Sequence, residues 1–458
     1  MAPELTFGVE FILERLARHC FKAYIAGGAV RDMVNQKQPS DVDIVTNASL
    51  AEIQRIFKGE HVRMVGKSFH VCLVNGIEVA SLRGRASAFP ESDLGKRDLT
   101  INSMAWDPET RSVIDPFSGQ KDLEHRIIRF TRDGDQRILE DPLRMVRACR
   151  FVSQINGRLS PEAFDAITAH GDLVNTQVAK ERIRSEILKA MVHDRPSLFF
   201  NALRETGLLK IIFPCLDRLV DLDGGPFHGE TVFEHCMIVG DSLSPRRPLL
   251  RLAGFLHDGG KFEAAGVKEG RLTFHGHETY REEIVADLER LKFSNQEIAY
   301  IDAVIRVHMR PLTQETTPKA VRRILALLEQ HGVTYQEFMR MRIADMGGNL
   351  AKRPYTLGEI RIRLNKLLTE IRRNGAAGFA IQDLAINGKE VMALLNLPQG
   401  PAVGRVMNLL FERVLDDPTL NTREALEALV RSLEPGLFGP GEERGGQGEA
   451  AQAQHPKK

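Results

Sequence analysis

The sequence lacks long hydrophobic runs and paired cysteines, and each absence excludes a class of protein. No apolar run approaches the roughly 20 residues that span a bilayer, and the first ten residues, MAPELTFGVE, lack the basic and then apolar pattern of a secretory signal. The five cysteines lie far apart with no CxxC pair, which argues against zinc fingers and a disulfide framework. We therefore expect a cytoplasmic protein with no membrane partner and with reduced, mostly buried thiols.

Aromatic residues and net charge are also low. Aromatic residues make up 6% of the chain, which argues against a surface built on base stacking. The net charge is +1, but residues 301–373 contain 14 Lys and Arg against 7 Asp and Glu. This local excess fits contact with a phosphate backbone. It fits equally well a set of solvated helix faces whose charges are paired elsewhere.

The hydrophobic pattern divides the chain into two kinds of structure. The first 125 or so residues change period often, with short strands expected at 23–26 and 41–46 and a hairpin turn at Asn75-Gly76. Ser49 and Glu52 form the capping box of a helix that follows the second strand and runs to Phe57. From Leu123 onward, apolar residues recur at helical spacing almost throughout. We predict an α+β protein: a mixed α/β head followed by an all-helical body.

A glycine pair followed by two aspartates is the first chemical signal. Gly27 and Gly28 allow the backbone to approach a triphosphate, and Arg31 lies one turn later, where it could bind a phosphate with two hydrogen bonds. Asp41 and Asp43, two residues apart on a strand, point to the same face. Two carboxylates so close favour a divalent metal, which removes their repulsion and bridges to phosphate oxygens.

Further motifs follow in order: KRDLTIN at 96–102, DPFSGQKDLEHRIIRF at 115–130, EDPLRMVR at 140–147 and VAKERIRSEILKAM at 178–191. With these motifs, roughly the first 190 residues resemble the class II tRNA nucleotidyltransferases and their bacterial poly(A) polymerase relatives. The resemblance implies transfer of CMP, and in some members AMP, from CTP or ATP to the 3′ end of tRNA without a nucleic-acid template.

The resemblance also implies roles for individual residues. Asp41 and Asp43 would be catalytic and hold two Mg²⁺ ions, with Glu78 as a candidate third carboxylate. Arg97 and Asp98 match the motif that recognises the ribose, although Lys96 replaces the first of its two usual arginines. The full set of expected nucleotide-binding residues is Gly27, Gly28, Arg31, Arg97, Asp98, Asp141, Arg144 and Arg147.

Asp141 and Arg144 match the residues that select the base in this family. Three residues apart on a helix, they are expected to share a face. A carboxylate accepts a hydrogen bond from the amino group of cytosine or adenine, and a guanidinium donates to the neighbouring ring acceptor. Uracil and guanine present a carbonyl in place of that amino group. These residue types therefore predict selection of C and A.

The segment between Glu78 and Arg97, VASLRGRASAFPESDLGK, looks shortened relative to members that add all of CCA. Members that add CC and stop are known by such a shortening. Addition of CC alone, addition of complete CCA, and A-adding or poly(A) activity all stay open.

A second constellation, at residues 228–345, resembles an HD domain. By position its metal ligands would be His235, His257, Asp258 and Asp345, a mixture that suits a second divalent metal acting on phosphate esters. Gly259 stands where that family usually has an apolar residue. The neighbouring histidines His275, His277 and His308 could add ligands or bind phosphate.

We expect five regions. They are a catalytic head at 1–125, a helical nucleotide-recognition region at 126–222, an HD domain at 223–350, a helical tRNA-binding region at 351–433 and a disordered tail at 434–458. The break DLDGGPFHG (221–229) marks a junction. Expected partners are the tRNA 3′ end, CTP and ATP, and the oligomeric state stays open. The alternatives are a poly(A) polymerase, an HD phosphohydrolase with a nucleotide-sensing head, and a non-catalytic RNA-binding protein.

Overall fold

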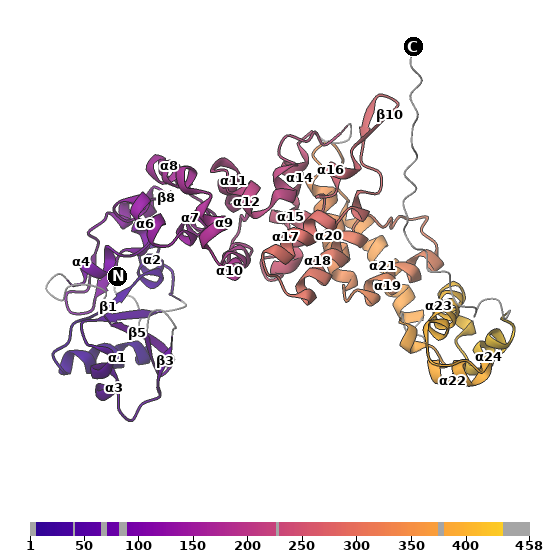
Figure 1. Cartoon of the computed structure of the whole chain (residues 1–458), viewed down its shortest axis with the longest axis horizontal. Helices are drawn as coiled ribbons and strands as arrows, with labels where there is room; N and C mark the ends of the chain where they lie inside the picture. The colour runs from indigo at the N-terminus through magenta and orange to yellow at the C-terminus, as the bar shows by residue number, and fades with distance from the viewer. Residues whose placement is uncertain are drawn as a thin grey trace, which may run out of the picture. The chain divides into compact units, whose positions relative to one another are not determined.

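The computed structural model describes residues 6–39, 42–65, 71–81, 89–225, 229–373 and 380–433. The chain forms two compact units, Met1–Met309 with Glu337–Tyr355, and Arg310–Gln336 with Thr356–Lys458. A mixed α/β head precedes a mostly helical remainder, so the predicted fold class is confirmed (Figure 1). Within the described residues, no helix combines the length and the apolar composition needed to cross a membrane. Asp41, part of the segment before Arg97 (82–88), part of the 221–229 break (226–228) and the tail at 434–458 lie outside the described residues.

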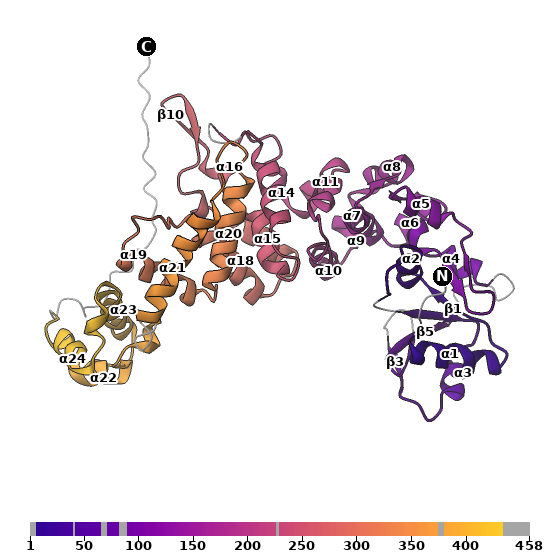
Figure 2. The ribbon, with the colours of Figure 1, turned by 180° about the vertical axis from the view of Figure 1, so that it is seen from behind.

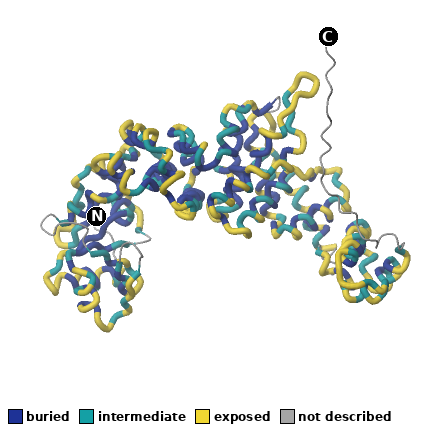
Figure 3. The backbone as a smooth tube through the Cα atoms, viewed as in Figure 1, coloured by how far each residue is buried: buried dark blue, intermediate teal, exposed yellow. Residues whose placement is uncertain are grey.

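The head is built on a seven-stranded sheet with the strand order β3-β4-β5-β2-β1-β6-β7. Strands β2 and β5 are parallel, and the other neighbouring pairs are antiparallel. All four residues of the inner strand β1 are buried (Figure 3). The strands are β1 Ala23–Ala26, β2 Asp43–Thr46, β3 Val62–Val65, β4 Val71–Val74, β5 Ile77–Ser81, β6 Ala105–Asp107 and β7 Ser112–Ile114.

Local sequence signals account for several of these elements. Asn75 and Gly76 both have positive φ, 52° and 87°, and they join β4 to β5 as the predicted two-residue hairpin turn. Ser49 accepts a hydrogen bond from the backbone of Glu52, whose side chain bonds back to the Ser49 backbone, so the predicted capping box is confirmed. The helices of the head are α1 Phe7–Arg18, α2 Gly28–Val34, α3 Leu50–Ile56, α4 Glu91–Leu94 and α5 Gly119–Glu124.

The rest of the first unit is helical, with two short strand pairs that the sequence did not predict. These are β8 Ile127–Ile128 with β9 Arg158–Leu159, and β10 Gly266–Lys268 with β11 Arg271–Thr273. Strands of two or three residues are too short to show an alternating pattern. The helices are α6 Gly134–Glu140, α7 Leu143–Ile155, α8 Pro161–His170, α9 Leu173–Gln177, α10 Lys180–Ala190, α11 Ser197–Glu205, α12 Leu209–Ile212, α13 Pro214–Asp217, α14 Val232–Ser242, α15 Pro248–Leu256, α16 Lys261–Ala264, α17 Glu282–Arg290, α18 Asn295–Val307 and α20 Tyr335–Gly348.

A buried arginine joins two segments of this helical part. Arg251 on α15 is 1% exposed and donates to the carbonyl oxygens of Met191, His193 and Asp194 after α10. It also donates to the carbonyls of Gly240 and Asp241 near the end of α14. Helix ends leave carbonyls without intrahelical partners, and here one side chain satisfies several of them.

The second unit contains α19 Pro318–Gln330, α21 Leu357–Arg373, α22 Gly388–Leu395, α23 Pro401–Asp416 and α24 Arg423–Arg431. Helices α22, α23 and α24 lie side by side in both views and share one apolar cluster (Figures 1 and 2). Part of the basic stretch is internal to the fold, because Arg322 donates to the carbonyls of Leu415 and Asp416 and pairs with Glu370. Arg363 likewise donates to the carbonyl of Leu312, 2.8 Å away.

The five cysteines are free thiols, and four of them are buried. Cys20 is exposed. The expectation of mostly buried thiols is confirmed.

Candidate functional site

The first candidate site begins at the edge where β2 and β5 start. Asp43 is the first residue of β2, and the parallel register places it opposite Glu78 on β5. Residues paired across neighbouring strands project from the same face of the sheet, so the two carboxylates are neighbours. Asp43 and Glu78 lie far apart in the sequence, so no local pattern shows that they are neighbours. The strand register places Glu78, the candidate third carboxylate, beside Asp43.

Gly27 lies across from these carboxylates at the start of α2. Its φ of 78° lies in the region that favours glycine. A Cβ at this position would lie 2.7 Å from Nη1 of Arg97 and 3.8 Å from Oδ2 of Asp43. The missing side chain therefore leaves room for the Arg97 guanidinium beside the Asp43 carboxylate.

Asp98 is buried in a network of donors. Its Oδ1 accepts from the backbone of Leu99 and from Asn102, and its Oδ2 accepts from Nε of Arg147 at 2.7 Å. Burial alone would raise the pKa of the Asp98 carboxyl, but Arg147 and these hydrogen bonds hold that pKa below its usual value. Asp98 is therefore a fixed anion at neutral pH.

Asp141 and Arg144, the pair expected to select the base, do not share a helix face as the sequence predicted. Asp141 lies in an extended conformation between α6 and α7, with φ −157° and ψ 97°, and only Arg144 is in α7. Pro142 explains the break, because the residue before a proline is driven out of the helical region. Arg144 donates to the carbonyls of Lys96 and Arg137 and to Glu140, so it is anchored to the loop that carries Arg97.

Arg182 is a residue that sequence reasoning left without a role. It lies on α10 and donates to both oxygens of Asp141, at 3.1 and 2.7 Å. The motif at 178–191 was the only sequence signal for it. Glu186, one turn later, is buried and accepts from Arg150 at 2.5 Å. Helix α10 therefore supports both Asp141 and the helix that carries Arg147.

One pocket with a volume of about 260 Å³ is lined by most of these residues, but not by Gly27, Arg182 or Glu186. The pocket gathers two carboxylates from the sheet, the ribose-recognition motif and the base-selection pair into one space. Its lining is Asp43, Ile44, Val45, Val71, Glu78, Ala80, Lys96, Arg97, Asp98, Asp141, Arg144 and Arg147.

Arg31 is absent from this lining. Its guanidinium is buried, donates to Asn102 at 2.7 Å and lies over the ring of Phe151. Asn102 in turn donates to Asp98. Arg31 is thus connected to the pocket through Asn102, and the structure gives its guanidinium a supporting position behind the Asp98 network.

The second candidate site is a buried cluster within the helical part of the first unit. His235 on α14 has its Nε2 3.3 Å from Oδ1 of Asp345 on α20 and 3.6 Å from Oδ2 of Asp258. Nε2 of His257 lies 3.2 Å from the same Asp258 oxygen. The four residues named from sequence are therefore together. His277 and His308 join them, whereas His275 is exposed.

The charges of this cluster are strongly perturbed. His308 is fully enclosed, and burial together with His257 and His277 lowers its pKa to about 3. Burial opposes ionisation of Asp258, but His257 and Lys261 hold the pKa of that carboxyl well below its usual value. Lys261 contributes directly, with Nζ 2.8 Å from Oδ2 of Asp258. A buried anion among imidazoles is a typical environment for a metal.

Packing explains why a glycine stands at position 259, directly after His257 and Asp258. A Cβ there would lie 2.7 Å from Cδ1 of Ile284 on α17. Ile284 thus occupies the space that an apolar side chain at 259 would need.

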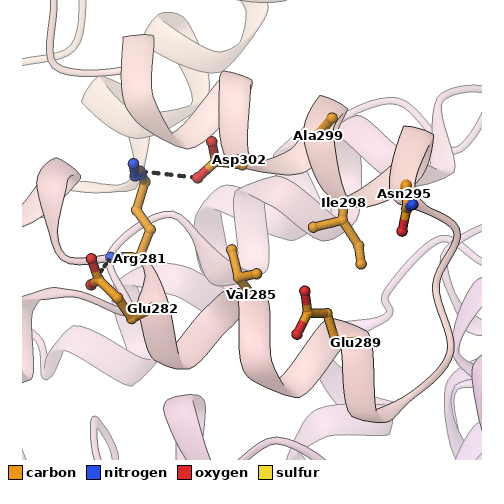
Figure 4. Close-up of a pocket in the computed structure, with 8 residues that line it drawn as sticks. All are labelled: Arg281, Glu282, Val285, Glu289, Asn295, Ile298, Ala299 and Asp302. Carbon is orange, nitrogen blue, oxygen red and sulfur yellow. Dashed lines mark hydrogen bonds and ion pairs between the residues drawn. The ribbon is translucent and has the colours of Figure 1, made fainter.

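A wider hollow lies between α17 and α18, with a volume of about 440 Å³ (Figure 4). Arg281 spans it to pair with Asp302 at 3.0 Å. None of the predicted site residues lines it, and its lining mixes carboxylates with Val285, Ile298 and Ala299. Its size alone therefore gives no reason to assign it chemistry.

Family models match three parts of the chain. The model described as "Poly A polymerase head domain" matches residues 23–129, and the one described as "Probable RNA and SrmB- binding site of polymerase A" matches residues 158–219. A third, described as "tRNA nucleotidyltransferase domain 2 putative", matches residues 274–430.

Individual relatives agree with these matches. The chain is 32% identical to the A-adding tRNA nucleotidyltransferase of Deinococcus radiodurans over 337 residues, which cover 70% of this chain and 74% of the relative. It is 38% identical to the CC-adding tRNA nucleotidyltransferase of Halalkalibacterium halodurans over 205 residues, 44% of this chain and about half (52%) of that relative.

Among solved structures, the Bacillus stearothermophilus CCA-adding enzyme in complex with CTP superposes with a TM-score of 0.65 and 23% identity, covering 92% of this chain and 96% of that one. This likeness shows the same fold. Fold and family matches together define a nucleotidyltransferase, an enzyme that transfers a nucleotide to an acceptor. More closely, the chain belongs to the class II tRNA nucleotidyltransferases.

Proposed function

We propose that this enzyme transfers CMP from CTP to the 3′ end of tRNA, either adding CC alone or, with AMP from ATP, building or repairing the complete CCA terminus. The observation that carries the proposal is the 260 Å³ pocket, which joins Asp43 and Glu78 to Asp98 and to the Asp141–Arg144 pair. Relatives named A-adding, CC-adding and CCA-adding support the same class of reaction.

The carboxylates at this edge fit a divalent metal of the Mg²⁺ type. Asp43 and Glu78 are adjacent, and carboxylate oxygens are the ligands that Mg²⁺ prefers. With Asp41 they would hold the ions, which when bound lower the pKa of the primer 3′-hydroxyl and stabilise the leaving pyrophosphate. The hydroxyl oxygen attacks the α-phosphorus of the nucleotide in line, and the bond to pyrophosphate breaks.

The chain's own residues position the nucleotide. Asp98, held as an anion by Arg147, accepts from a ribose hydroxyl, and Arg97 fills the space left by Gly27. Arg144 uses three of its five N–H groups on protein acceptors and keeps the others for a base. Asp141 accepts from the exocyclic amino group of cytosine or adenine, which excludes uracil and guanine.

The number of nucleotides added is tested directly with transcripts that end before CCA, after C and after CC. Each is offered CTP and ATP separately. We expect CTP addition to the first two, and Asp43→Asn should abolish turnover while tRNA binding in a filter assay persists. Efficient ATP addition to the CC-ended transcript would exclude CC-only activity. Together with CTP addition to the first two transcripts it would identify a complete CCA-adding enzyme, and without that CTP addition it would identify an A-adding enzyme. Unchanged turnover in Asp43→Asn would exclude the proposed site.

A second activity is favoured by the buried cluster of His235, His257, Asp258 and Asp345. We propose that these residues bind a divalent transition metal and hydrolyse phosphate esters at nucleotide or RNA 2′,3′ ends. Elemental analysis of the purified protein tests the metal. His257→Ala should lose it, and His275→Ala, an exposed histidine outside the cluster, should keep it. A full metal content in His257→Ala would exclude this site.

The proposal gives a role to each of four regions of the chain. Residues 1–125 form the catalytic head, 126–222 the nucleotide-recognition region, 223–350 the HD domain and 351–433 the part that holds the tRNA body. The family match at 274–430 overlaps the last two regions.

A further inference from the structure

The ring of Phe151, on α7, lies close to three arginines. The Cζ atoms of Arg150, Arg31 and Arg147 lie over this ring, 4.2, 5.3 and 5.7 Å from its centroid. A cation within about 6 Å of an aromatic centroid is attracted by the negative face of the ring. Phe151 is 4% exposed, so water screens these interactions little. One side chain therefore attracts three cations that come from two helices, α2 and α7.

Two of the three arginines have buried carboxylate partners. Nη2 of Arg147 lies 2.6 Å from Oδ2 of Asp98, and Nε of Arg150 lies 2.5 Å from Oε2 of Glu186. Nη1 of Arg147 also lies 3.7 Å from Oε1 of Glu186. These contacts form a chain of alternating charges that begins at Asp98, in the lining of the nucleotide pocket.

Arg31 is the third cation, and its charge has a weaker partner. Its ion pair is with Asp32, at 3.3 Å, whose side chain is 28% exposed and therefore partly screened by water. Burial lowers the pKa of Arg31, and the charge of Arg147 lowers it further, whereas Asp32 raises it. Arg31 and Arg147 thus repel each other, and the ring of Phe151 offsets that repulsion because it attracts both.

Removal of the ring would leave this repulsion unopposed. Arg147 has the most freedom to respond, because its side chain is 29% exposed, whereas those of Arg31 and Arg150 are 9% and 8% exposed. Arg147 also lines the pocket, so it would move into the pocket and away from its place beside Asp98. The ring therefore fixes the Asp98–Arg147 pair.

We propose that Phe151 is a positioning residue for ribose recognition, because its ring holds Arg147 in the orientation that fixes Asp98 in the pocket. The inference rests on the role proposed above for Asp98, and it adds a residue that does not itself line the pocket. The property of the nucleotide that Phe151 controls is the 2′-hydroxyl, which CTP has and dCTP lacks.

Phe151→Leu tests the proposal, because it keeps an apolar side chain and removes the ring. Transfer to the transcript that ends before CCA gives kcat/KM for CTP and for dCTP. We expect the ratio of these two values to fall about tenfold, because kcat/KM for CTP falls and that for dCTP stays nearly the same.

Phe293→Leu is the matched control. Phe293 is also buried and has the guanidinium of Arg184 over its ring at 5.3 Å, and neither residue lines the pocket. Its CTP-to-dCTP ratio should equal that of the unaltered enzyme. An equal fall in both variants would show that lost packing changes the ratio, and it would overturn the role of the Phe151 ring.

Fluorinated phenylalanines at position 151 test the same contact even where Phe151→Leu does not fold. Fluorine withdraws electron density from the ring face and changes the shape of the ring little, so the attraction for a guanidinium weakens. The CTP-to-dCTP ratio should fall stepwise from phenylalanine to its monofluoro and trifluoro derivatives. A constant ratio across the series, in variants that circular dichroism shows to be folded, would overturn the proposal.

The outcomes separate this inference from the proposed function. CMP transfer with an unchanged ratio in folded Phe151→Leu would overturn the positioning role and leave the transfer reaction standing. An unaltered enzyme that uses CTP and dCTP equally well would overturn the ribose role of Asp98, and the positioning role with it. Absence of CMP transfer by the unaltered enzyme would overturn the proposed function and this inference together.

Discussion

At the scale of single residues, the pocket depends on ion pairs that hold its polar side chains in place. Arg182 donates to both oxygens of Asp141, and the backbone N–H of Leu143 donates to Oδ1, so three of the roughly four acceptor positions of this carboxylate are in use. The remaining position, on Oδ2, can accept from a base. Arg182 therefore acts as a positioning residue for base selection.

This role predicts a loss of discrimination in Arg182→Ala. Without the pair, Asp141 keeps only the hydrogen bond from the Leu143 backbone and is held less firmly, so kcat/KM for CTP should fall about tenfold, equivalent to about 1.4 kcal/mol, and UTP incorporation should rise. Arg182→Lys should recover part of the discrimination. The matched control is Arg184→Ala on the same helix, because Arg184 pairs with Glu297. An unchanged CTP-to-UTP ratio in Arg182→Ala would contradict the role.

The Asp98–Arg147 pair predicts a pH effect. The pKa of Asp98 is depressed in the folded protein, so the anion is present above that pKa and its contribution is lost only when the pH falls below the usual carboxyl range. In Arg147→Gln, burial dominates and raises the pKa of Asp98. The acid limb of kcat/KM for CTP, measured from about pH 5 to about pH 9, should therefore move to higher pH.

Arg129→Gln is the control for this profile, because Arg129 pairs with Asp122 and Glu162 and does not line the pocket. Its acid limb should match that of the unaltered enzyme. If the acid limb of kcat/KM in Arg147→Gln also matches that of the unaltered enzyme, activity does not depend on Arg147 keeping Asp98 ionised.

At the scale of elements, the turn from β1 to α2 carries two glycines with different constraints. Gly27 has a positive φ, and a Cβ there would lie 2.7 Å from Nη1 of Arg97, whose guanidinium would have to shift, whereas at Gly28 the nearest atom would be at 3.5 Å, an ordinary contact. Gly27→Ala should therefore displace Arg97 and strain the turn.

We expect Gly27→Ala to lower kcat/KM for CTP by about ten- to a hundredfold, and Gly28→Ala to stay within about twofold. Steady-state kinetics with the transcript that ends before CCA measures kcat/KM for both variants. Equal losses in the two variants would show that the turn tolerates neither glycine substitution, and that the Arg97 contact is not the reason.

At the scale of the whole molecule, the basic stretch at 301–373 separates into internal and exposed cations. Arg322 and Arg363 are used on carbonyl oxygens within the second unit. Arg361 and Arg372 on α21 are exposed. Only exposed cations can contact tRNA phosphates and release the counterions that surround them.

The double variant Arg361→Ala/Arg372→Ala should raise KM for tRNA about three- to tenfold with kcat unchanged. It should also make log KM less dependent on log[salt], by about 0.7 per lost phosphate contact. Arg18→Ala, an exposed arginine of α1 paired with Glu14, is the control. A KM and salt slope equal to those of the control would place the tRNA body elsewhere.

Local sequence signals determined the fold class, the Asn75-Gly76 hairpin, the Ser49 capping box and the candidate residue types, because each depends on neighbours within a few positions. They also placed His257 beside Asp258, since those two are adjacent in the chain. The extended conformation of Asp141 was missed because the pattern suggested a helix through Pro142.

Only the tertiary structure decided which groups meet. The strand register brings Glu78 to Asp43, α10 brings Arg182 to Asp141, and three separate segments bring His277 and His308 to Asp258. The packing also turns Arg31 toward Asn102 and Phe151 and buries Arg322. These contacts join residues tens of positions apart, and their partners follow from how whole elements pack, which no local pattern in the sequence specifies.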